Sequence, residues 1–119
     1  MKSFTELDAW KVGMQLIKEV HFLTKKFPQE ERYGMTAQIR KSSASVLANI
    51  AEGFGRYTYP DKANRYIIAR GECTETAAYL YIAAELEWIS LCEMERAIDL
   101  ARQTGKLLSG LIASCKKLS

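Results

Sequence analysis

A periodic set of polar side chains is the part of this sequence with the greatest capacity for chemistry. Within the segment QIRKSSASVLANIAEGFGR, residues 38–56, polar groups recur in steps of four, three, four and three at Gln38, Ser42, Ser45, Asn49 and Glu52. This spacing keeps all five, here called the polar stripe, on one face of a helix. The stripe has three interpretations: an active site, a surface that holds nucleic acid, or a polar seam pressed between helices.

The active-site interpretation lacks a base. Ser45, Asn49 and Glu52 resemble a nucleophile with its helpers, but the only histidine, His21, falls among the core positions of an earlier helix. The segment GFG at 53–55 closes a helix instead of opening one after a strand, so it is a poor phosphate loop. We therefore expect a protein that is not an enzyme.

Metal and cofactor sites are not indicated either. The three cysteines, Cys73, Cys92 and Cys115, stand far apart without a C-x-x-C motif, whereas a zinc site needs four close-set ligands. An odd number of cysteines also argues against a disulfide framework, and the Glu-x-x-His motifs of di-iron bundles are absent. We expect no metal, no cofactor and three reduced, partly buried thiols.

The length and composition are typical of one globular domain, which we expect to span residues 1–119. No apolar run approaches the roughly 18 residues that cross a bilayer, so no membrane association is expected. The N-terminal residues lack the apolar core and cleavage site of a signal peptide, which favours the cytoplasm. A net charge of +3 permits an anionic partner without requiring one.

Long amphipathic patterns separated by Pro28 and Pro60 predict an all-α protein. The expected helices cover about residues 6–27, 33–54, 61–89 and 91–115. Their predicted starts carry N-capping pairs, Thr5 with Asp8, Thr58 with Asp61, and Ser90 with Glu93, and the Gly53 and Gly55 pair is expected to stop the second helix. Because the loops are short, the helices must form an antiparallel up-down-up-down four-helix bundle.

The third predicted helix is more apolar than three neighbours can cover. One of its stripes carries Ile68, Tyr79, Ile82, Leu86 and Ile89, and another carries Tyr66, Cys73, Ala77, Leu80 and Ala84. A helix with apolar residues on nearly every side lies deep in a protein or faces another subunit. The pattern therefore favours a homo-oligomer.

The seam is the interpretation of the polar stripe that we prefer. Small residues at Ser42 and Ser45 let helix axes approach closely, so Asn49 and Glu52 are expected to hydrogen-bond across the gap. At least one of Glu72 and Glu75 on the third helix is expected to be half buried and then needs a partner, for which Arg40, Arg70 and the groups of the stripe are candidates. We predict a polar seam or oligomer interface made of Gln38, Ser42, Ser45, Asn49, Glu52 and Glu75.

The segment FPQEERYGMTAQIRKSSASVLANIAEGFGRY closely resembles the signature of the four-helix-bundle proteins named for the intervening sequences of bacterial 23S ribosomal RNA. The resemblance runs along nearly the whole chain. Matching residues are Trp10, Phe27-Pro28, Glu31, Tyr33-Gly34, Gln38-Ile39-Arg40, Ser45 and residues 49–53. In ARGECTE, Ala69, Gly71 and Glu75 match the family's Ala-x-Gly-Ser-x-x-Glu, whereas Glu72 and Thr76 depart from its usual serine and leucine.

This resemblance implies a cytoplasmic bundle that assembles into a ring-like homopentamer and has no catalytic activity. It also implies a role with nucleic acid, because a similar pentameric bundle is the accessory factor of the reverse transcriptase in diversity-generating retroelements.

Two functions remain open on these grounds. Nonspecific binding of RNA or DNA would use basic side chains near the two turns that flank the second helix, namely Lys25, Lys26, Arg40, Lys41, Arg56, Lys62 and Arg65. Tyr57 and Tyr59 stand among these charges and are candidates for stacking on bases. The alternative is a scaffold that offers a surface to a protein partner. Phe22 favours this alternative, because it falls outside the buried stripes of the first helix and is expected to be exposed.

Overall fold

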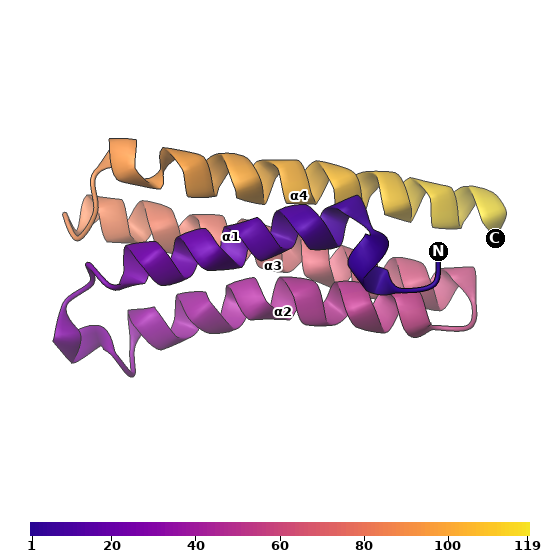
Figure 1. The fold of residues 1–119 in the computed structure, drawn as a ribbon, viewed down its shortest axis with the longest axis horizontal. Coiled ribbons are helices and arrows are strands. Elements are labelled where there is room, and N and C mark those ends of the chain that lie inside the picture. The colour runs from indigo at the N-terminus through magenta and orange to yellow at the C-terminus, as the bar shows by residue number, and fades with distance from the viewer.

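Four helices run antiparallel in the computed structural model, which describes residues 1–119 (Figure 1). They are α1 (Asp8–Thr24), α2 (Met35–Gly55), α3 (Tyr59–Glu85) and α4 (Leu91–Leu118), with short 3-10 turns at Phe4–Glu6 and Gln29–Glu31. There is no β-strand. The all-α four-helix bundle expected from the sequence is therefore confirmed, and no helix combines the length and apolar composition that a bilayer crossing requires.

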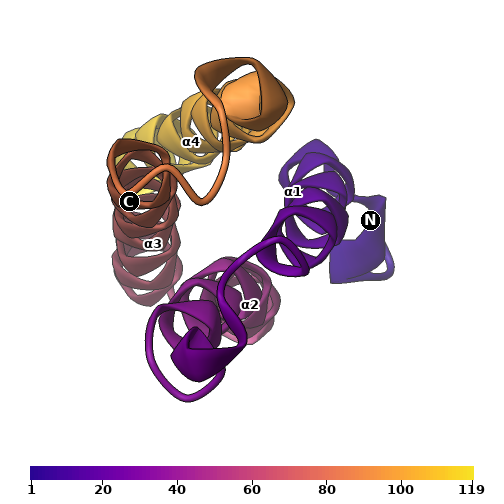
Figure 2. The same ribbon diagram turned by 90° about the vertical axis from the view of Figure 1, so that its left-hand side faces the viewer.

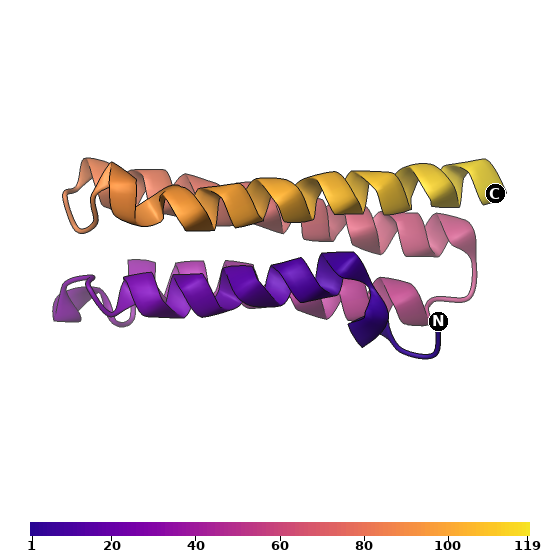
Figure 3. The ribbon, with the colours of Figure 1, turned by 45° about the horizontal axis from the view of Figure 1, so that its top comes forward.

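The helices occupy the corners of a square, seen along the bundle in Figure 2. Each packs against the helices before and after it in the chain, α4 also packs against α1, and α1 lies diagonally opposite α3. The bundle measures about 45 × 25 × 20 Å. Figure 3 shows the α1–α2 and α3–α4 turns together at one end, with the α2–α3 turn and both termini at the other.

Capping residues start two of the helices where the sequence predicts. Ser90 and Glu93 form a complete capping box, in which Glu93 N donates to Ser90 Oγ at 3.0 Å and Ser90 N donates to Glu93 Oε1 at 2.9 Å. Thr58 accepts a hydrogen bond from Asp61 N at 3.3 Å, which satisfies an amide that the first turn leaves unpaired.

The predicted cap at Thr5 is wrong. Ser3 caps the 3-10 turn by accepting from Thr5 N at 3.2 Å, and α1 begins only at Asp8, after Leu7. Leu7 is 7% exposed, so burial of this apolar side chain determines where α1 starts. The tertiary contact outweighs the local capping preference.

Helix α3 ends at Glu85, four residues before the end predicted from the pattern. Glu87 takes a left-handed backbone conformation with φ of 63°, and Trp88 N donates to Ala83 O while Glu87 N donates to Ala84 O, both at 3.0 Å. These two bonds form a Schellman motif. The sequence signal was missed because the left-handed position holds glutamate instead of the usual glycine.

The core is built from one apolar stripe of every helix. Its largest fully buried aliphatic side chains are Leu16, Val20, Leu23, Ile39, Val46, Ile50, Leu80 and Leu108. Full burial of each such side chain stabilises the fold by roughly 1.5–3 kcal/mol. Since all four helices contribute, the bundle depends on their joint packing.

Helix α3 leaves an apolar surface uncovered, as its sequence predicts. Its buried stripe runs from Ala63 to Ala83, and the opposite side, here called the outer face, consists of Ile67, Ile68, Gly71, Glu75, Ala78 and Ile82. The three isoleucines remain 39–44% exposed. The protomer therefore covers this face only in part.

Candidate functional site

The polar stripe of α2 faces α3 across a small polar hollow. The hollow has a volume of about 210 Å³ and no hydrophobic residue in its lining, which consists of Gln38, Lys41, Ser42, Ser45, Glu72 and Glu75. Of the predicted seam residues, Gln38, Ser42, Ser45 and Glu75 lie around this hollow, whereas Asn49 and Glu52 do not. Glu72, which the seam prediction did not include, completes the lining.

One buried hydrogen bond joins the two helices beside this hollow. The hydroxyl oxygens of Ser42 and Thr76 lie 2.8 Å apart, and both side chains are at most 4% exposed. One hydroxyl donates to the other, and the hydroxyl that accepts is free to donate to a carbonyl of its own helix, Ser42 to Ile39 O at 3.1 Å or Thr76 to Glu72 O at 2.9 Å. Leucine, the usual residue of the family at position 76, has no side-chain oxygen and could not form this hydrogen bond with Ser42, whereas Thr76 can.

Asn49 does not bridge the helices, so this part of the seam prediction is wrong. Its side-chain amide donates to Ser45 O at 2.9 Å and to Ser45 Oγ at 3.1 Å, both within α2. The backbone carbonyl one helical turn earlier competes successfully as the acceptor for this amide. Asn49 therefore fixes Ser45 and is itself buried against α3, with 9% exposure.

Glu52 does reach across to α3, although at the surface. Its carboxylate pairs with Arg56 at 2.7 Å on α2's C-terminal side and with Arg65 of α3 at 3.4 Å. About half of the Glu52 side chain is exposed, so each pair contributes at most about 1 kcal/mol.

The two carboxylates of the polar hollow perturb each other. Desolvation raises the pKa of Glu72, and the charge of Glu75 and a hydrogen bond with it raise this pKa further, against a smaller opposing effect of Lys41. Glu75 also accepts a hydrogen bond from the Tyr79 hydroxyl at 2.9 Å. The pair is therefore poised to hold a proton or to meet a cationic group.

Neither arginine proposed as a partner for these carboxylates serves as one. Arg40 Nε donates to Thr24 Oγ1 at 2.9 Å, and Arg70 Nη1 donates to Ser109 Oγ at 3.2 Å. Both guanidinium groups are turned towards other helices, which the helical pattern of a single segment does not reveal.

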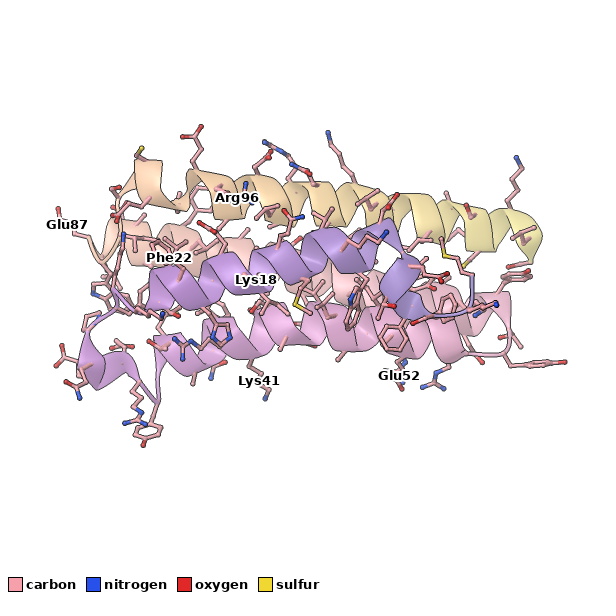
Figure 4. The ribbon with its side chains drawn as sticks, in the orientation of Figure 1. Lys18, Phe22, Lys41, Glu52, Glu87 and Arg96 are labelled. Carbon is pink, nitrogen blue, oxygen red and sulfur yellow. The ribbon has the colours of Figure 1, made fainter.

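The seven predicted basic residues divide between opposite ends of the bundle. Lys25, Lys26, Arg40 and Lys41 lie towards the α1–α2 turn, and Arg56, Lys62 and Arg65 surround the α2–α3 turn. Figure 4 shows Lys41 and Glu52 projecting from the same side of α2 at well-separated points. Arg40 and Arg56 are about 24 Å apart along α2 at 1.5 Å per residue. One protomer therefore presents two basic clusters, not one field.

Five of these seven side chains already have partners in the protomer, among them Arg40, which donates to Thr24. Lys26 pairs with Glu93 of α4, and Arg56 and Arg65 share Glu52. Lys62 Nζ donates to Phe54 O at 2.6 Å and, at 3.4 Å, to Gly53 O, which are carbonyls of the last turn of α2, and Gly53 O also accepts from Arg56 N. The cluster at the α2–α3 turn is thus largely used to hold that turn.

At the α1–α2 turn, in contrast to the α2–α3 turn, cationic side chains line a hollow. Thr24, Lys25, Gln29, Arg32, Thr36 and Arg40 are among the eight residues that line this space of about 410 Å³. Arg32 was missed in the sequence, where it stands in the acidic segment QEER. Only the fold shows that its side chain faces the same space as Lys25 and Arg40.

His21 lies at the surface beside this cluster, so its predicted place in the core is wrong. Partial desolvation lowers the pKa of His21, and the charges of Arg40 and Lys25 lower it further. Burial is the larger cause of this shift in the pKa, and the two cations add to it in the same direction. No group of three histidine, cysteine, aspartate or glutamate side chains lies close enough to hold a metal ion.

Comparisons with known proteins extend over most of the chain. Residues 5–110 match the family described as 23S rRNA-intervening sequence protein. A crystal structure of a protein of unknown function from the S23 ribosomal protein family of Bacteroides thetaiotaomicron has the same fold, with a TM-score of 0.80. It is 26% identical in sequence, and the match covers 87% of this chain and 97% of that one. No curated protein matches the sequence.

Proposed function

Because the chain belongs to the 23S rRNA-intervening sequence protein family, we propose that it is a cytoplasmic, non-catalytic bundle that forms a homo-oligomer and binds RNA or DNA nonspecifically. The resemblance noted in the sequence makes a ring-like homopentamer the expected assembly. The observation that carries the proposal is the uncovered outer face of α3.

The composition of the outer face is that of a helix-packing surface. Ile67, Ile68 and Ile82 supply apolar area, while Gly71 and Ala78 are small enough for another helix axis to come close. A Cβ added at Gly71 would meet no atom within 4 Å in the protomer. Glycine inside a helix costs about 1 kcal/mol relative to alanine, so the packing of the protomer gives no reason for it, whereas a close subunit contact does.

A groove beside the outer face enlarges the apolar area available for contact. It lies between α3 and α4, measures about 860 Å³, and includes Tyr81, Leu91, Met94 and Ile98 in its lining. Tyr81 and Leu91 are 54% and 70% exposed. Four charged residues, Glu95, Arg96, Asp99 and Arg102, also line the groove, so it combines apolar and charged surface, as protein interfaces commonly do.

Nucleic-acid binding is supported by charge. Each protomer carries a net charge of +3, and Lys25 and Lys41 have no carboxylate within ion-pair distance. An oligomer would bring several copies of these side chains onto one particle, which strengthens attraction to a phosphate backbone without reading its sequence.

Assembly is tested by placing a charge on the outer face. Ile68→Glu is expected to dissociate the oligomer in sedimentation velocity at micromolar concentration, because an unpaired carboxylate in an apolar interface is costly. Phe22→Glu is the matched control, since Phe22 is 55% exposed on α1, diagonally opposite α3, and should leave the size unchanged. A monomeric wild type, or an Ile68→Glu variant of unchanged size, would contradict the proposed assembly.

Nucleic-acid binding is tested by titration with single-stranded RNA and duplex DNA at several salt concentrations. Binding to phosphates predicts an affinity that falls with salt, with a log–log slope of about 0.9 per contact on duplex and about 0.7 on single strands. Affinity that does not change with salt would exclude a phosphate-based mode.

A protein-binding scaffold is the second candidate function. It is favoured by the ion pairs and carbonyl contacts that already engage Lys26, Arg56, Lys62 and Arg65. If the intact oligomer binds neither RNA nor DNA at low salt, the scaffold remains and the nucleic-acid proposal is withdrawn.

A further inference from the structure

We propose that the α1–α2 turn is a binding site for single-stranded nucleic acid, in which the hollow beside Lys25, Arg32 and Arg40 holds one backbone phosphate and Tyr33 stacks on a neighbouring base. This inference rests on the proposed function and specifies the place and the form of the nucleic acid.

The lining of the hollow suits a phosphate. Three cationic side chains, from Lys25, Arg32 and Arg40, share it with hydrogen-bonding groups of Thr36 and Gln29, and no carboxylate lines it. The turn holds two glutamates outside this lining, Glu30 and Glu31, and Glu31 accepts a hydrogen bond from Met35 N at 3.0 Å. The hollow therefore combines positive charge with donors, as phosphate oxygens require.

Arg40 is held in place before any ligand arrives. Its Nε donates to Thr24 Oγ1 at 2.9 Å, and Thr24, which is 4% exposed, donates its own hydroxyl proton to Val20 O at 2.8 Å. This buried threonine orients the guanidinium, whose two terminal amino groups make no hydrogen bond or ion pair within the protomer. A planar, oriented guanidinium can bind two oxygens of one phosphate with little loss of side-chain entropy.

Lys26, which follows Lys25 in the sequence, does not line the hollow. Lys26 is neutralised by Glu93 and lies 5.3 Å from the Phe22 ring, so its charge is directed away from the hollow. His21 lies near the same two cations: partial burial is the main cause of its lowered pKa, and the charges of Arg40 and Lys25 lower this pKa further.

Tyr33 gives the site a preference for single strands. Its ring is 86% exposed, and the Arg32 guanidinium carbon lies 5.6 Å from the ring centroid. An exposed aromatic ring beside a cation is the arrangement on which unpaired bases stack. Bases in a duplex are already stacked on each other and cannot reach it.

Binding is measured by fluorescence anisotropy with a labelled oligouridylate and with a duplex of equal length. Tyr33→Leu is expected to weaken binding of the single strand about tenfold, within the range for one lost base–aromatic stack, and to leave the duplex unaffected. Tyr33→Phe should bind like the wild type. Tyr57→Leu is the matched control, because Tyr57 is 98% exposed at the opposite end of the bundle.

The phosphate contact is measured from the salt dependence. Arg40→Gln and Lys25→Gln should each lower the log–log slope on single strands by about 0.7, the value for one phosphate contact, whereas Arg56→Gln should not. Lys25 is exposed, so its variant keeps the test valid if Arg40→Gln disturbs the fold. Loss of binding from the Arg56 and Tyr57 variants, with the Arg40 and Tyr33 variants unchanged, would overturn the site while leaving the proposed function intact.

Anion binding in the hollow is tested separately by NMR titration of His21. The chain has one histidine, so the imidazole signals need no assignment. Sulfate should raise the pKa of His21 more than chloride at equal ionic strength, and Arg40→Gln should remove the difference. Equal effects of the two anions would overturn the site. A sulfate effect without RNA binding would reject both the proposed function and nucleic acid as the occupant.

Discussion

At Gly53, α2 packs directly against Tyr66 and Arg65 of α3, and Gly53→Ala tests that packing. The sequence suggests that this glycine stops α2, but its φ is not positive and the helix continues to Gly55. A Cβ at residue 53 would instead lie 2.7 Å and 2.9 Å from Cε1 and Cδ1 of Tyr66, and 3.1 Å from Arg65 Cβ. Glycine is required here because an aromatic ring occupies the space.

The expected cost follows from two opposing effects. Tyr66 is 3% exposed, so its ring cannot swing into solvent, and overpacking of this kind destabilises a protein by about 1–3 kcal/mol. Alanine recovers up to about 1 kcal/mol of helix propensity. Gly53→Ala is therefore expected to lower the free energy of unfolding by about 1 kcal/mol.

Gly110→Ala separates these effects, because a Cβ at Gly110 would meet no atom within 4 Å. It should raise the free energy of unfolding by up to about 1 kcal/mol. Urea denaturation of both variants at one protein concentration then gives a difference of about 1–3 kcal/mol, which is the packing effect alone.

Equal stabilities of the two alanine variants would refute the close-packing explanation. A double-mutant cycle gives a second check, because Gly53→Ala should lose its cost in a Tyr66→Leu background, where the clashing ring carbons are absent. A cost that persists there would assign the effect to the backbone of α2 instead of the Tyr66 ring.

Three further outcomes are expected. Thr76→Val, which removes the hydroxyl that meets Ser42 at 2.8 Å, should lower the free energy of unfolding in urea by about 1 kcal/mol. The hydrogen bond from Lys26, helped by the backbone of the capping box, lowers the pKa of Glu93 from 4.5 to about 2. Its contribution to stability is therefore complete above pH 4.5 and is lost as the pH falls towards 2, so Glu93→Gln should weaken the pH dependence of acid unfolding followed by circular dichroism. Cys92, the one exposed thiol, should react with iodoacetamide before the other two cysteines, as mass spectrometry of the timed reaction would show; equal rates would contradict their burial.

Local patterns were sufficient where the interactions are local. The apolar periodicity of each helix and the cap at Ser90 depend on residues within a turn of one another, so reading along the chain reveals them. Thr5 shows the limit, because burial of Leu7 delayed the start of α1.

The candidate site was predicted only in part, for a geometric reason. Helical spacing places Ser42 and Ser45 on one face, but it does not show which group on another helix each one meets. Asn49 turned back to its own helix, whereas Ser42 reached Thr76. Which of two competing partners a side chain selects depends on distances that exist only after packing.

The order of amino acids by itself determined that this protein is a bundle of four helices, because helix formation and its apolar faces follow from interactions over three or four residues. It also indicated that α3 carries more apolar surface than the protomer covers. Only the tertiary structure decided how the cations are distributed. It paired Lys26 and Arg65 with carboxylates and left Lys25 and Arg32 around a hollow, since electrostatic partners are selected by proximity in space and not by separation along the chain.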